Sequence, residues 1–119
     1  MHIFTFNTHF LDEPNAPGKP EIIDYDNQSV KLKWEAPKSD GGRPVTHYII
    51  EMLNKYQPDW VEVMPTETDA TEFKVPGLKE RMSYQFRVRA VNKAGKSAPS
   101  APTENHIVKH KNRKYFQSG

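Results

Sequence analysis

The sequence VPGLKERMSYQFRVRAVNKAG, residues 75–95, carries the strongest structural signal in this chain. It starts at the end of a strand and enters a tight turn at Pro76-Gly77, because glycine adopts backbone angles that other residues avoid. Leu78 follows as an isolated apolar residue, and a turn at residues 92–96 closes the run. Between them apolar and polar residues alternate, which predicts an inward strand face formed by Tyr84, Phe86, Val88 and Ala90. This order predicts the corner between the two sheets of a β-sandwich.

The flanking segments show the same two-residue period of half-buried strands. A short strand at residues 60–63 is predicted at a sheet edge, and prolines interrupt the chain between residues 97 and 103. From residue 21 to residue 108 the pattern gives about seven strands at hairpin spacing, without any helical period. The flanking residues predicted to face the core are Val30, Leu32, Trp34, Tyr48, Ile50, Phe73 and Val75.

The composition excludes several classes of protein. With 119 residues, of which 35% are hydrophobic, the chain suffices for one domain with a modest core. No stretch approaches the roughly 20 apolar residues of a membrane-spanning helix, and the start lacks the features of a signal peptide. The net charge of +2 predicts a mixed surface, unlike that of most nucleic-acid-binding proteins. Because cysteine is absent, a reducing compartment is favoured. We expect a monomer that binds neither nucleic acid nor membrane.

The two ends of the chain differ from its centre. Residues 1–16 are aromatic-rich and then proline-rich, which is typical of an extended lead-in to a domain. Residues 109–119 are basic and finish in a string that resembles the remnant of a cleaved purification tag. The predicted organisation is an N-terminal extension over residues 1–16, a domain over residues 17–108 and a basic tail over residues 109–119.

Motifs of catalysis and of metal binding are missing from the sequence. It has no cysteine nucleophile, no Gly-x-Ser-x-Gly motif and no phosphate-binding glycine loop before a helix. Asp40-Gly41-Gly42 joins two predicted strands and is typical of a turn. His106 and His110 would stand roughly 13 Å apart on an extended chain, with no acidic ligand nearby in sequence. We therefore predict no catalytic residue, no cofactor and no metal.

Four residues are candidate contacts with a partner protein. Arg87 and Arg89 are expected on the outer face of their strand beside Glu51, where opposite charges attract by about 0.2–1 kcal/mol per pair. Local charge pairing and partner binding are alternative interpretations of that position. Trp60 either anchors a partner, as tryptophan often does in interfaces, or packs against a neighbouring strand. The full set is Ile49, Trp60, Arg87 and Arg89.

Four core positions together resemble the framework of a fibronectin type III domain over roughly residues 17–108. They are Trp34, Tyr48, Leu78 and Tyr84. The resemblance implies that the tryptophan and the first tyrosine fill the space between the sheets. It also implies that the leucine closes one open end and that the second tyrosine hydrogen-bonds to the preceding loop. Arg81-Met82 departs from the small or polar turn that is usual in the family, which leaves the shape of this turn open.

Longer motifs resemble the type III domains of giant intracellular muscle proteins. This group comprises titin, twitchin, projectin and myosin-binding protein C, and within it we expect a twitchin-like or projectin-like domain. The motifs are PGKP at 17–20, WEAP at 34–37, SDGGRPV at 39–45, YIIE at 48–51 and RVRAVNKAG at 87–95.

The resemblance implies a non-catalytic structural and protein-interaction module in a tandem array of a sarcomeric, titin-like protein. It would provide mechanical spacing and dock on the thick filament. Its location would be the cytoplasm of muscle, in the A-band of the sarcomere. Its partners would be neighbouring immunoglobulin or type III domains and myosin. The first and last strands, residues 21–25 and 106–108, would bear the load. The parent protein of such a module can include a separate kinase domain.

Two alternative functions remain open. The first is an extracellular receptor or adhesion domain that binds a protein ligand. Asn27-Gln28-Ser29 fits a glycosylation sequon, and its occupancy would distinguish that function. The second is electrostatic docking of the basic run at residues 109–114 on an acidic partner.

Overall fold

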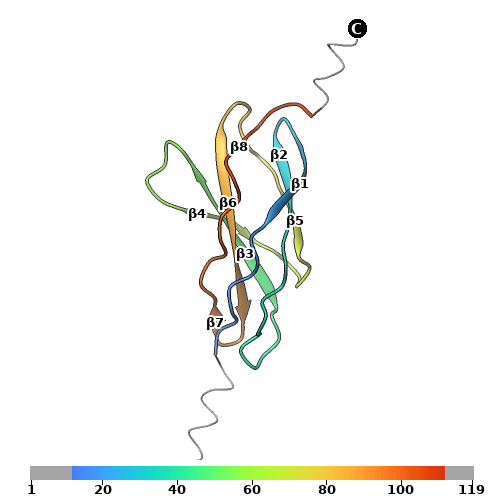
Figure 1. Ribbon diagram of the computed structural model, residues 1–119, viewed down its shortest axis with the longest axis vertical. Helices are drawn as coiled ribbons and strands as arrows, with labels where there is room; N and C mark the ends of the chain where they lie inside the picture. Colours follow the sequence, from blue (N-terminus) through green and yellow to red (C-terminus); the bar gives the residue numbers. More distant parts are fainter. Residues whose placement is uncertain (1–11, 112–119) are drawn as a thin grey trace, which may run out of the picture.

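A computed structural model describes residues 12–111 and shows two antiparallel β-sheets packed face to face (Figure 1). In the smaller sheet the strands follow the order β1-β2-β5; in the larger sheet the order is β4-β3-β6-β7, and β8 also pairs with β6. The smaller sheet contains β1 (Glu21–Asp26), β2 (Ser29–Lys33) and β5 (Glu72–Val75). The larger contains β3 (His47–Asn54), β4 (Val61–Pro65), β6 (Ser83–Asn92), β7 (Gly95–Lys96) and β8 (His106–Ile107). The all-β sandwich predicted from the sequence is confirmed. Most of the predicted N-terminal extension and basic tail lies outside the described residues.

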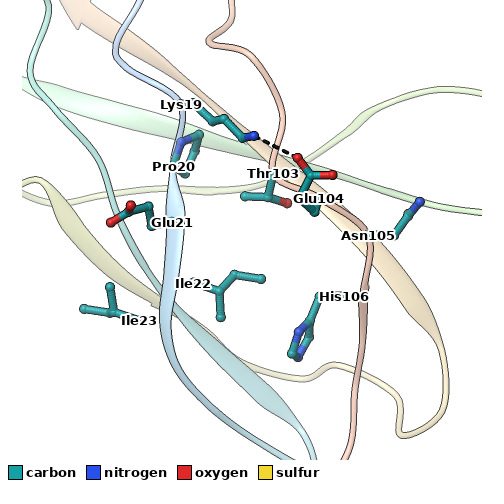
Figure 2. Close-up of a pocket in the computed structure, with 9 residues that line it drawn as sticks. All are labelled: Lys19, Pro20, Glu21, Ile22, Ile23, Thr103, Glu104, Asn105 and His106. Atoms are coloured by element: carbon teal, nitrogen blue, oxygen red, sulfur yellow. Dashed lines mark hydrogen bonds and ion pairs between the residues drawn. The ribbon is translucent and has the colours of Figure 1, made fainter.

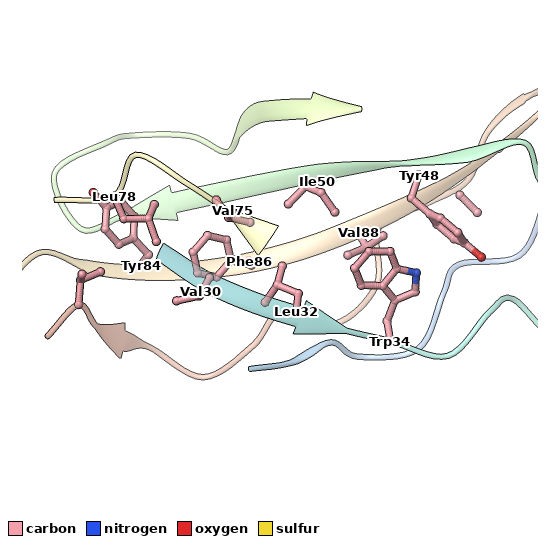
Figure 3. Packing of buried hydrophobic residues seen from close by; sticks show 12 residues of the cluster. Val30, Leu32, Trp34, Tyr48, Ile50, Val75, Leu78, Tyr84, Phe86 and Val88 are labelled. Atoms are coloured by element: carbon pink, nitrogen blue, oxygen red, sulfur yellow. The ribbon is translucent and has the colours of Figure 1, made fainter. Parts of the chain in front are cut away.

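The core lies between the two sheets and is built from alternate residues of the strands (Figure 3). Trp34 and Tyr48 meet edge to face, with ring centroids 5.2 Å apart, a favourable geometry for aromatic pairs. Phe73, which was expected inside, is half-buried and packs against the cluster. The buried apolar residues are Val30, Leu32, Trp34, Tyr48, Ile50, Val75, Leu78, Tyr84, Phe86, Val88, Ala90 and Val108.

The corner between β5 and β6 is held by hydrogen bonds to its own loop. The Tyr84 hydroxyl accepts a hydrogen bond from the Lys79 amide at 3.1 Å, so the buried phenol has a polar partner. Arg81 adopts a φ of 73°, which costs a residue other than glycine about 1–3 kcal/mol. The Arg81 amide donates to the Val108 carbonyl at 2.8 Å, which helps to offset this strain. The turn that the sequence left open is therefore left-handed at Arg81.

The last strand of the sandwich is divided in two by residues 97–105. In this segment every third residue, Ser97, Ser100 and Thr103, carries a hydroxyl and is buried. Their amides donate to the carbonyls of Ala90, Val88 and Phe86 at 2.8, 2.9 and 2.8 Å. Their hydroxyls accept from the amides of the same three β6 residues at 2.9, 3.0 and 3.0 Å. This hydroxyl ladder satisfies the free edge of β6 where regular pairing stops.

No helix within residues 12–111 has the length and apolar character to cross a membrane.

Candidate protein-interaction site

A charged cluster occupies the outer face of the larger sheet. Arg87 Nε donates to Glu51 Oε1 at 2.6 Å, and Arg89 Nε donates to Glu51 Oε2 at 3.0 Å. The strand register explains this arrangement, because Glu51 on β3 lies directly opposite Arg87 on β6 and diagonal to Arg89. The three side chains are only 13–21% exposed, so the cluster is more protected than an ordinary surface ion pair. The pairing with Glu51 that the sequence predicts is present.

The charge on Glu51 is stabilised by its two arginine partners. Burial alone would raise the pKa of the Glu51 carboxyl, but the hydrogen bonds from Arg87 and Arg89 outweigh it and hold this pKa below its ordinary value. The carboxylate and one guanidinium balance each other, which leaves one net positive charge on the three side chains.

Trp60 extends the cluster to the edge of the sheet. It immediately precedes β4, and the Arg87 guanidinium lies over its ring at 4.4 Å from the centroid. At the other end, Arg89 Nη1 donates to the Ser97 carbonyl at 3.0 Å. Ile49 shares this outer face, because it is paired with Arg89 and alternates with buried neighbours on β3. The structure thus gathers the four candidate contact residues on one sheet face, each of them half-buried.

Sequence reasoning identified Tyr56 as an exposed apolar residue, but it did not identify Val61 and Met64 on β4. Val61 and Met64 are 42% and 41% exposed, and Tyr56, in the loop before β4, is 74% exposed. The short strand was expected at an edge, but its residues lack a clean two-residue alternation. A register shift in the pairing of β3 with β4 explains this irregularity. Val61 pairs with Met52 and Met64 pairs with Ile50, so both lie on the core-facing side of this edge and not beside Trp60 and the charged cluster.

The incoming chain is bound to the sandwich before its first strand. The Asn92 side chain is buried, and its Nδ2 donates to the carbonyls of Asp12 and Asp40 at 2.8 and 2.7 Å. Its Oδ1 accepts from the amides of Ala94 and Gly95 at 2.8 and 3.1 Å. One asparagine thereby joins the incoming segment, the β2–β3 loop and the β6–β7 turn.

Backbone contacts reinforce this attachment. The Asp12 amide donates to the Gly41 carbonyl at 3.1 Å, and the Asn15 amide donates to the Ser39 carbonyl at 2.9 Å. Residues 12–15 therefore contact the domain although the sequence places them in an extension. The boundary at residue 17 stays a prediction.

The outgoing chain is attached at the opposite end of the sandwich (Figure 1). Val108 is fully buried, and its amide donates to the Met82 carbonyl at 3.0 Å. Lys111 forms an ion pair with Asp24 on β1, and its hydrogen bond lowers the pKa of the Asp24 carboxyl. His110 Nε2 lies 3.7 Å from the Glu80 carboxylate. The first residues of the predicted basic tail thus contact β1 and the turn between β5 and β6.

An open groove of about 740 Å³ separates β1 from the segment that leads into β8 (Figure 2). Lys19 and Glu104 bridge it with an ion pair of 2.9 Å. Within it His106 contacts the Tyr25 ring at a centroid distance of 5.0 Å. Burial, assisted by the charge of Lys109, lowers the pKa of His106. In the described part of the chain, no group of three His, Cys, Asp or Glu residues is placed to hold a metal.

These features define the class of protein. Two antiparallel sheets enclosing Trp34, with Tyr84 bound back to its own loop, form an immunoglobulin-like β-sandwich. The sequence profile of the "Fibronectin type III domain" matches residues 15–106, which is most of the chain. The chain belongs to the fibronectin type III family.

Three curated relatives are similar in sequence. The "Titin homolog" of Caenorhabditis elegans is 43% identical over 112 residues, which cover 92% of this chain and 1% of that protein. "Protein sax-3" of the same organism is 37% identical over 73% of this chain and 7% of its own length. Human "Myomesin-2" is 34% identical over 80% of this chain and 6% of its own length. The chain spans a small fraction of each relative.

Two solved structures share the fold and clear sequence identity. Domains A168–A170 of titin superpose with a TM-score of 0.78 at 39% identity, covering 83% of this chain and 33% of that one. The twitchin kinase region of C. elegans superposes with a TM-score of 0.79 at 31% identity, covering 87% and 19%. This twitchin region joins a type III domain, a kinase and an immunoglobulin domain in one chain.

Proposed function

We propose that this chain is one non-catalytic module in a tandem array of a titin-like muscle protein, where it provides mechanical spacing and a docking surface for the thick filament. The relatives named titin homolog and myomesin support a structural or interaction role in muscle proteins. Its immediate partners would be the neighbouring immunoglobulin or type III domains, as in the titin and twitchin structures. The module would work in the cytoplasm of the sarcomere, in its A-band.

One observation carries the spacing role. The chain enters at one end of the sandwich and leaves at the other, and it is bound to the domain at both ends (Figure 1). A force applied to the two ends passes through β1 and β8, and the antiparallel pairing of β1 with β2 carries the load at the entry side. Because both flanking segments are bound, the orientation of adjacent domains would also be restricted.

Stretching the chain by its two ends tests this role. We expect a single cooperative unfolding step in optical tweezers, with an added length of roughly 3.3–3.6 Å for each residue released. Gradual extension at low force would show that the domain does not act as a mechanical unit and would contradict the spacing role.

We infer that the docking surface is the outer face of the larger sheet, with Ile49, Trp60, Arg87 and Arg89 as its contact residues. One net positive charge beside a tryptophan and the half-buried Ile49 fits an acidic, partly apolar helical partner such as the myosin rod. Tryptophan and arginine are also the residues that most often dominate binding energy at interfaces.

A binding assay with myosin rod filaments tests the docking surface. Trp60→Ala should weaken binding at least about tenfold, because it removes the apolar anchor and the support of Arg87. Lys31→Ala, on the smaller sheet, is the matched control and should leave binding unchanged. Equal binding by both variants would remove this surface from consideration. Glycan occupancy of Asn27 in the native protein would instead favour the extracellular alternative.

A further inference from the structure

The outgoing segment, residues 104–111, is attached to the domain by few contacts. Its strand β8 pairs two residues with the first two residues of β6, whereas β1 and β2 pair over five positions. Beyond β8, Val108 is fully buried and donates its amide to the Met82 carbonyl. A segment held by two strand pairs and one buried side chain can open while the rest of the sandwich stays folded.

His106 is the residue of β8 that joins the two sheets, because its ring lies in the groove beside β1 (Figure 2). The ring meets Tyr25 of β1 edge to face, and its Nε2 atom is buried without a hydrogen-bond partner among the described residues. A neutral imidazole can carry its one proton on Nδ1 and leave Nε2 bare. A protonated imidazole carries a proton on both nitrogens, so Nε2 would then be a buried donor without an acceptor.

The groups around His106 do not supply that acceptor. Glu21 of β1 and Glu104 line the same groove, but within residues 12–111 neither forms an ion pair with His106, and Glu104 is bound to Lys19. Burial and the positive charge of Lys109 both oppose protonation and lower the pKa of His106. The closed groove therefore favours the neutral ring.

Two features of β6 and of the turn before it bear on the opening. Tyr84, which pairs with His106, already uses its hydroxyl to accept a hydrogen bond from the Lys79 amide. Arg81 has a φ of 73° while its amide donates to the Val108 carbonyl at 2.8 Å. When Val108 leaves, this bond is lost and Arg81 is free to relax, which offsets part of the cost of opening.

We propose that His106 is a proton-operated latch on the outgoing segment. At neutral pH the uncharged ring packs against Tyr25, and residues 104–111 stay bound. In mildly acidic solution His106 takes up a proton and leaves the groove for water, and β8 and Val108 detach while the other strands stay folded. The released residues would lengthen the connection to a following module. The latch does not use the outer sheet face, so either proposal can fail without the other.

Amide hydrogen exchange of residues 1–119 between pH 7.5 and 5.0 tests the latch, with each rate corrected for the intrinsic effect of pH. The Val108 amide reports on the outgoing segment, and the Val88 amide, which is bonded to Ser100, reports on the centre of the sandwich. At pH 7.5 Val108 should be less protected than Val88, because it exchanges through the local opening. At pH 5.0 the protection of Val108 should be lower by at least about fivefold, the lower end of the effect of a buried donor without an acceptor.

Two outcomes in the unchanged chain would exclude the latch, and neither depends on how a variant folds. Equal protection of Val108 and Val88 would show that the segment opens only with the whole domain. Protection of Val108 that does not change with pH would show that no proton controls the opening.

Two variants identify the residue that takes up the proton. His106→Gln cannot be protonated, so the protection of Val108 should no longer depend on pH. His110→Gln changes another histidine of the same segment, which lies beside Glu80, and this matched control should keep the dependence. An equal fall in the protection of Val108 in His106→Gln and in the unchanged chain would overturn the assignment to His106.

Discussion

At the scale of single residues, Gly41 shows how one position joins two distant segments. Its φ is 77°, and a Cβ atom there would lie 2.0 Å from the Asp12 carbonyl oxygen. Gly77 has a similar φ of 72°, but a Cβ atom there would have no neighbour within 4 Å. Both glycines adopt the left-handed backbone conformation that their turns require. Only at Gly41 does the missing side chain also leave room for the incoming chain.

We expect Gly41→Ala to detach residues 12–15, and Gly77→Ala to leave them in place. Both variants bear the cost of left-handed alanine, about 1–2 kcal/mol. Hydrogen exchange of the Asn15 amide, which is bonded to Ser39, is the measurement, and it should accelerate beyond the global loss of stability only in Gly41→Ala. Similar exchange in the two variants would show that the close approach at Gly41 does not hold the segment.

The sequence predicts the turn at Asp40-Gly41-Gly42 from its composition, but not this contact. A turn is a local property of a few residues, and glycine and aspartate reveal it directly. Contact with Asp12 depends on how the β2–β3 loop and the lead-in meet in space, and it leaves no period in the sequence. The same reason explains why the fourfold hydrogen bonding of Asn92 was not anticipated.

At the scale of elements, the side chains of the hydroxyl ladder accept hydrogen bonds from β6 amides that the carbonyls of a regular neighbouring strand would otherwise accept. Ser100→Ala would leave the buried Val88 amide without an acceptor, which costs about 1–3 kcal/mol. The midpoint of urea unfolding should fall accordingly. Ala101→Ser, which adds a hydroxyl on the exposed side of the same segment, should be nearly neutral. An unchanged midpoint in Ser100→Ala would mean that water or a shift of the chain replaces the ladder.

Strands with one inward and one outward face were predicted well, and the ladder was not. Residues 29–34 and 84–90 alternate between apolar and polar side chains, so their period identifies them directly. Residues 97–103 have small side chains and two prolines, which is also the composition of a loop. Their role depends on the unpaired amides of β6, and those amides become visible only when the sheet is assembled.

At the scale of the whole molecule, His106 should couple stability to pH. Burial lowers the pKa of His106 below its ordinary value of 6.5, so just below pH 6.5 the unfolded chain binds more protons than the folded chain. Stability should therefore decrease as the pH falls through 6.5 toward the folded pKa. The pKa of Glu51 lies below 4.5 in the folded state, so its contribution is present above pH 4.5 and is lost only in stronger acid.

Urea unfolding between pH 7.5 and 4.5 measures this coupling. His106→Gln should reduce the dependence of the free energy of unfolding on pH below pH 6.5. Loss of the contact with Tyr25 should also lower the stability of this variant at every pH. His47→Gln, on the outer face of β3, should keep the original slope. An equal slope in the unchanged chain and in His106→Gln would exclude His106 as its origin.

The prolines of the 97–103 segment have a consequence for arrays of similar domains. Adjacent modules in one chain face each other at effective concentrations on the order of millimolar, where an exposed strand edge would pair with its neighbour and promote aggregation. Pro99 and Pro102 have no amide hydrogen to offer, and the amides of Ser97, Ser100 and Thr103 are already used on β6. This edge of the sandwich therefore resists misassembly between modules, so that repeated domains can unfold and refold beside one another without joining their sheets.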